Sequence, residues 1–96
     1  MNAKAVRKYR HQLEQLKSKG GIKTREVVSL AESLGRKRRD RGKEPTYINE
    51  QFKNLTPLSI PDHSTDLNKY TARGILIQLE KDVEMWEIFF KIDQEN

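Results

Sequence analysis

The chain has 96 residues, of which 34% are hydrophobic and 34% are charged, and it contains no cysteine. A chain of this length forms one domain, which we expect to span residues 1–96. The lack of cysteine excludes disulfides and thiolate metal sites, and no apolar run exceeds three residues, which excludes a membrane-spanning helix. No export signal is visible, so we expect a cytoplasmic protein. The sequence contains no zinc pattern and no Gly-rich phosphate loop, so we expect neither a metal nor a cofactor.

The formal net charge of +5 conceals an uneven distribution of charge. Residues 1–43 carry 14 Lys and Arg against 4 Asp and Glu, whereas residues 44–96 carry 5 against 10. A clustered positive potential attracts phosphates, so the first half of the chain indicates a nucleic-acid partner. The alternative is an internally complementary protein whose two halves neutralise each other.

Residues 3–18 predict an amphipathic helix, because apolar side chains recur there at spacings of three and four residues. These side chains are Val6, Tyr9, Leu13 and Leu16. Gly20 and Gly21 end this helix. A second helix of about 11 residues begins at Thr24 and ends before Gly35, which suits a left-handed C-terminal cap.

Residues 36–63 contain prolines and β-favouring residues rather than a helical pattern. We expect three short strands, near 36–41, 45–50 and 56–60, that form a small antiparallel sheet. Six of the eight residues in the run 36–43 are Lys or Arg. A sheet face covered by helices cannot hold unpaired guanidinium groups, so the first strand is expected at a sheet edge.

The last third of the chain predicts a helix from about residue 72 to 92, with Thr71 as its N-cap. Its apolar positions follow a helical period and include Ile75, Leu76, Leu79, Val83, Trp86 and Phe90. Such a helix is about 30 Å long, which is more than a three-stranded sheet needs. Its far end must therefore contact the N-terminal helix or a second copy of the chain. The element order predicts an α+β fold.

Three stretches of residues 23–79 share patterns with a known family. Residues 24–35 are similar to that family's first helix, and residues 60–63 (Ile-Pro-Asp-His) to the end of its third strand. Residues 67–78 match its most specific pattern, Lys-x-Thr-x-Arg-x-Ile-Leu-x-Gln. The chain thus resembles the HicA (YcfA-like) toxins, which are small mRNA interferases.

The resemblance implies a core at residues 23–79 with the α-β-β-β-α fold of double-stranded-RNA-binding domains (dsRBD-like). Residues 1–20 then form a helical extension, and residues 80–96 extend the C-terminal helix. The implied function is that of an RNA-binding toxin, a metal-independent endoribonuclease, with RNA and an antitoxin protein as partners. The family's catalytic His lies in a Gly-Ser-x-His segment, whereas the corresponding residues 42–47 (Gly-Lys-Glu-Pro-Thr-Tyr) contain no His.

We expect RNA contacts from the basic run and from one arginine of the last helix, because Lys and Arg bind phosphates irrespective of sequence. The expected residues are Arg36, Lys37, Arg38, Arg39, Arg41, Lys43 and Arg73. The alternative is a solvated edge strand whose charges prevent edge-to-edge pairing. His63 is the candidate catalytic acid or base, although a His in this position also fits a turn.

The apolar stripe of the last helix is the candidate for partner contact, and its residues are Leu79, Val83, Trp86 and Phe90. The stripe lies in the acidic half of the chain, which repels phosphates. The aromatic cluster at this end of the helix is Trp86, Phe89 and Phe90. Core packing or a protein–protein contact, including a homodimer, therefore explains this cluster better than stacking on RNA bases. The alternative to RNA binding is accordingly a non-enzymatic interaction or dimerisation module.

Overall fold

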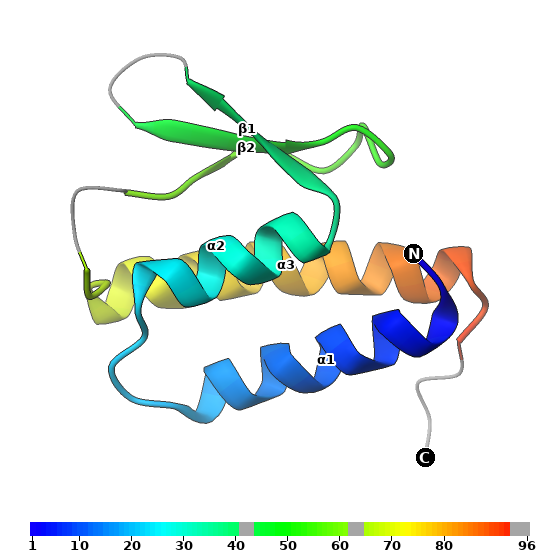
Figure 1. The fold of residues 1–96 in the computed structure, drawn as a ribbon, viewed down its shortest axis with the longest axis horizontal. Coiled ribbons are helices and arrows are strands. Elements are labelled where there is room, and N and C mark those ends of the chain that lie inside the picture. Colours follow the sequence, from blue (N-terminus) through cyan, green and yellow to red (C-terminus); the bar gives the residue numbers. More distant parts are fainter. Residues whose placement is uncertain (41–43, 62–64, 93–96) are drawn as a thin grey trace.

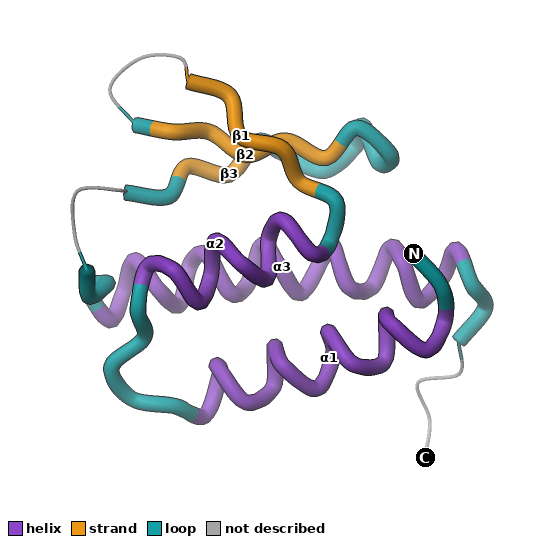
Figure 2. Tube along the Cα trace, viewed as in Figure 1, coloured by secondary structure: helices purple, strands orange, loops and turns teal. Residues whose placement is uncertain are grey.

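The computed structural model describes three segments of the chain, residues 1–40, 44–61 and 65–92. Within them the order of elements is α1 (Ala3–Ser18), α2 (Thr24–Ser33), β1 (Arg36–Asp40), β2 (Pro45–Asn49), β3 (Leu58–Ser59) and α3 (Lys69–Phe89). The strands form an antiparallel sheet in the order β1-β2-β3. The three helices lie on one side of that sheet (Figure 1, Figure 2). The α+β prediction is confirmed, and the part from α2 to α3 has an α-β-β-β-α layout.

The first two helices begin and end where their sequence patterns predict. The side chain of Asn2 caps α1 by accepting a hydrogen bond from the backbone N–H of Ala5 at 2.8 Å. Gly35 follows α2 with a φ of 99°, a conformation that costs glycine little. The glycine thus lets the chain turn sharply from α2 into β1.

The start of α3 differs from the prediction. The helix begins at Lys69, three residues before the expected position, and ends at Phe89. Asn68 is its N-cap, because its side-chain oxygen accepts a hydrogen bond from the backbone N–H of Tyr70 at 2.8 Å. The prediction that Thr71 caps this helix is therefore wrong, and Thr71 lies inside the first turn. Asparagine is the stronger N-cap residue of the two.

The edge position of β1 is confirmed, since β1 pairs with β2 alone in the described sheet. Asp40 is the last residue of β1, and the predicted Arg41 lies outside the described residues. β2 agrees with its prediction to within one residue, whereas β3 is shorter than predicted and holds two residues. A small sheet with one face against the helices leaves its other face open.

The apolar stripe of α3 packs into the hydrophobic core of the chain itself. Leu79 and Val83 are 0% exposed and Trp86 is 7% exposed, and the Trp86 indole N–H donates a hydrogen bond to the Leu34 carbonyl at 2.8 Å. The prediction that these three α3 residues bind a partner is therefore wrong, because their side chains are buried in the chain's own core. Phe90 is half-buried and stacks on the Trp86 ring, with ring centroids 5.9 Å apart.

One arginine of the basic run also lies in the core. The side chains of Arg36 and Asp82 are both 0% exposed and form a bidentate ion pair, with N–O distances of 2.7 and 2.8 Å. The remaining nitrogen of Arg36, Nη1, donates to the carbonyls of Tyr47 at 2.7 Å and Thr56 at 3.0 Å. The prediction that Arg36 contacts RNA is therefore wrong, because its guanidinium has no exposed surface and no free donor nitrogen.

No helix in the described part of the chain combines the length and the apolar character that crossing a membrane requires.

The buried ion pair predicts a large loss of stability when its carboxylate is removed. We expect Asp82→Asn to lower the free energy of unfolding by about 3–5 kcal/mol, because the Arg36 charge then stays buried without a counterion. Urea denaturation measures this loss. Glu84→Gln, on the exposed face of the same helix, is the matched control and should leave the urea midpoint unchanged. Equal midpoints for the two variants would contradict the prediction.

Candidate functional site

The exposed cations of β1 are Lys37, Arg38 and Arg39, which we call the basic strand. Their side chains are 65%, 44% and 40% exposed. Because successive side chains of a strand point to opposite faces, Lys37 and Arg39 project away from the helices when Arg36 points inward. The sheet therefore presents two of these cations on its open face and the third near its edge.

Among the described residues, two exposed carboxylates form ion pairs with the basic strand. Glu50 accepts from Lys37 at 3.1 Å and from Arg39 at 2.8 Å, and Asp40 accepts from Arg38 at 2.7 Å. The hydrogen bond from Lys37 lowers the pKa of Glu50, so this carboxyl stays ionised. Exposed pairs of this kind contribute little to stability and are screened by salt, so the three cations remain open to other anions.

Three predicted site residues lie outside the described residues. They are Arg41, Lys43 and His63. RNA contacts at the first two and catalysis at the third therefore stay predictions. Among the described residues the one histidine is His11, which is exposed on α1.

A groove of about 660 Å³ lies between the end of α1, the connection to α2 and the first half of α3, and we call it the helix groove. Its apolar lining residues are Ile22, Leu67, Ala72, Leu76 and Ile77. Its charged lining residues are Lys17, Lys19, Lys69, Arg73 and Glu80. Arg73 thus lines a groove shared with α1, which lies across the helix layer from the sheet (Figure 1). The structure does not bring Arg73 together with the basic strand, although the sequence placed both in one RNA contact.

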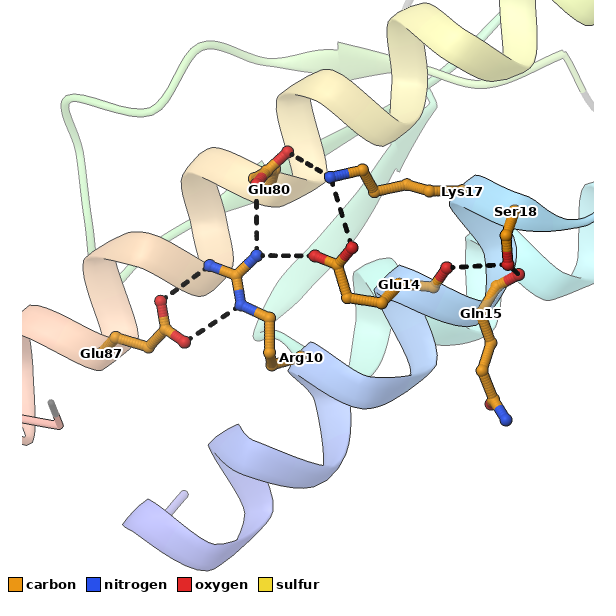
Figure 3. A network of polar contacts seen from close by, with 7 residues as sticks. All are labelled: Arg10, Glu14, Gln15, Lys17, Ser18, Glu80 and Glu87. Atoms are coloured by element: carbon orange, nitrogen blue, oxygen red, sulfur yellow. Dashed lines mark hydrogen bonds and ion pairs between the residues drawn. The ribbon is translucent and has the colours of Figure 1, made fainter. Parts of the chain in front are cut away.

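A network of ion pairs joins α1 to α3 (Figure 3). Arg10 donates to both carboxylate oxygens of Glu87 at 3.1 and 2.8 Å, and its Nη1 lies 3.2 Å from Glu80 and 3.1 Å from Glu14. Lys17 lies 3.1 Å from the same Glu80. The hydrogen bond with Glu87 raises the pKa of Arg10, which stays charged. Here the two halves of the chain do neutralise each other.

Several other cations, from both halves of the chain, form no ion pair within the described segments. Lys4, Arg7 and Lys8 are exposed on α1, and Lys69 and Arg73 are exposed on α3. Internal neutralisation is therefore partial. The described residues also contain no group of three or more His, Asp or Glu side chains that could hold a metal ion.

Comparisons with known proteins assign no family. No protein-family model matches the chain, and neither the curated proteins nor the solved structures gave a significant match.

The ion pair between α1 and α3 predicts a stability contribution that depends on pH. Lys17 hydrogen-bonds Glu80 and holds the pKa of that carboxyl below its ordinary value of 4.5. A carboxyl with a lowered folded pKa stabilises the fold above its unfolded pKa, and this contribution disappears as the pH falls through the folded pKa. We expect Glu80→Gln to cost about 1 kcal/mol or less above pH 4.5, with the cost approaching zero in stronger acid.

Urea denaturation of the wild type and Glu80→Gln across a pH series measures this difference. Glu84→Gln provides the control, because Glu84 is exposed and no ion pair of it is found among the described residues. A cost of Glu80→Gln that is the same at every pH would contradict the assignment.

Proposed function

We propose that this protein binds RNA through the basic strand, by electrostatic contacts that do not depend on RNA sequence. The observation that carries the proposal is the cluster of Lys37, Arg38 and Arg39, three consecutive exposed cations on an edge strand. A phosphate backbone offers a row of anions that can replace exposed carboxylates such as Glu50, because those pairs are weak.

The choice of RNA over DNA rests on two further points. Residues 67–78 match the pattern that the HicA-like toxins have at the start of their last helix. The order of elements from α2 to α3 is also compatible with the dsRBD-like core of that family. Both points support a HicA-like RNA-binding protein with an antitoxin as its protein partner. A small antitoxin-like reading frame beside this gene would support the toxin assignment further.

The proposal comprises binding and not cleavage. Residues 42–47 lack the family's catalytic His, and His63 lies outside the described residues. The described histidine, His11, is exposed on α1, and no other described residue pairs with it as an acid or a base. Contacts between these cations and RNA phosphates account for the charge of the basic strand without a catalytic step.

Electrostatic binding predicts a steep dependence of RNA affinity on salt. Three phosphate contacts give a slope of log K against log salt of about −2 for single strands and −3 for duplexes. Raising the salt from ~50 to ~200 mM should therefore weaken binding by about 20-fold to 40-fold. Fluorescence anisotropy with a labelled RNA measures the slope. Unchanged affinity over this range would contradict the proposal.

Removing charges from the basic strand should reduce the slope of log K against log salt. The double variant Lys37→Ala, Arg39→Ala should make it shallower by about 2 units, because two phosphate contacts are lost. Lys81→Ala is the control, since Lys81 is exposed on α3 and belongs neither to the basic strand nor to the helix groove. Equal slopes for the two variants would place the RNA contact elsewhere.

The binding-only proposal predicts that end-labelled RNA stays intact when it is incubated with the wild-type protein without a metal. Gel electrophoresis of the RNA measures this. Cleavage by the wild type that His63→Ala abolishes would overturn the binding-only proposal and assign catalysis to His63. Cleavage by both proteins would point to another residue or a contaminant, which a repeat preparation distinguishes.

A further inference from the structure

The helix groove combines an aliphatic floor with positive charges on both sides. Its floor comes from α3 and from the segments that precede α2 and α3. Lys17 and Lys19 lie on the α1 side, and Lys69 and Arg73 lie on the α3 side. A groove of about 660 Å³ falls within the usual range of ligand sites.

The charge of the groove is positive after its internal pairs are taken into account. Glu80, the one carboxylate among the described lining residues, is neutralised by Lys17 at 3.1 Å and Arg10 at 3.2 Å. Lys69 and Arg73 are exposed and form no ion pair within the described segments. The groove therefore presents two uncompensated cations beside an apolar floor, which calls for an anionic ligand with an apolar part.

The lining chemistry favours a peptide over RNA. The described lining residues include no aromatic side chain, so they offer unpaired bases no surface on which to stack. Its floor is aliphatic, with Leu76 buried and Ile77 53% exposed, and it suits aliphatic side chains. A concave apolar floor beneath a charged rim also fits a flat membrane surface poorly.

The length of the groove sets the size of the ligand. The lining residues of α3 run from Lys69 to Glu80, a distance of about 17 Å at 1.5 Å per residue. An extended peptide covers this distance with about five residues. The two free cations lie at the first turns of α3, so the carboxylates of the peptide belong at that end.

We propose that the helix groove binds a short acidic peptide segment of a partner protein. Aliphatic side chains of the peptide lie on Leu76 and Ile77, and its carboxylates pair with Lys69 and Arg73. The proposal does not depend on RNA binding, because the basic strand and the groove use different residues.

Selection from a random peptide library displayed on phage tests the proposal, with the folded wild-type protein as bait. The enriched peptides are synthesised and their affinities measured by fluorescence anisotropy for the wild type, Arg73→Glu and Ile77→Asp. Both changed residues are exposed, and circular dichroism checks that each variant is folded. Lys81→Glu is the matched control, because it reverses an exposed charge of the same helix outside the groove.

The expected result is enrichment of peptides that combine Asp or Glu with Leu, Ile or Val. Arg73→Glu and Ile77→Asp should each weaken their binding about tenfold or more, and Lys81→Glu should leave it unchanged. Lack of enrichment, or equal binding to the groove variants and the wild type, would overturn the proposal.

Two further measurements identify other occupants. Loss of RNA affinity in Arg73→Glu, with no peptide enriched, would make the groove an RNA site and overturn the proposal. Sedimentation that shows a wild-type dimer and an Ile77→Asp monomer would make the occupant a second copy of the chain and would overturn it equally. A salt-independent RNA affinity would defeat the RNA proposal alone.

Discussion

The ion pair between Arg36 and Asp82 fixes the position of the sheet relative to α3. One guanidinium contacts the carboxylate on α3, the carbonyl of Tyr47 on β2 and the carbonyl of Thr56 just before β3. Burial raises the pKa of Asp82, while the hydrogen bond and the charge of Arg36 lower it. Neither charge can be removed alone without leaving the other buried, so the pair acts as a fixed joint between β1 and α3. Once Arg36 points inward, the alternation of the strand sends Lys37 and Arg39 outward.

The position of α1 depends on a second set of charges. Arg10 and Lys17 hold α1 on α3 through Glu87 and Glu80, which lie toward the C-terminal half of α3. The network ends at Lys17 and Glu80, which also line the helix groove along the first half of α3. The same two helices therefore form a closed contact at one end and an open groove at the other. The uneven charge of the sequence was explained either by a polyanionic partner or by neutralisation within the chain. Both explanations hold in part, because some cations form internal ion pairs and others form none within the described segments.

Local patterns predicted much of the fold. The bounds of α1, the turn at Gly35 and the edge position of β1 all depend on neighbouring residues, which a sequence pattern captures. The inward arginine was not predicted, because its partner lies 46 residues away. A signal was nevertheless present, since Asp82 lies three residues after Leu79 and four before Trp86 on the buried stripe of α3. An acidic residue on a buried helix face indicates a buried cation elsewhere in the chain, because a buried charge has to be paired.

The length of α3 has a further consequence for binding. The helix α3 is longer than the sheet requires, and it also packs against α1. Leu79 and Val83 in its middle are 0% exposed, so these two side chains are closed to partners. The surfaces left for binding lie on either side of the helix layer, with the basic strand on the sheet and the helix groove beside α1 (Figure 1). Since the two surfaces share no residue, a polyanion on one and an acidic peptide on the other do not compete for the same cations. The helix α3 connects the two surfaces physically, because the sheet is joined to it by Asp82 and α1 by Glu80 and Glu87.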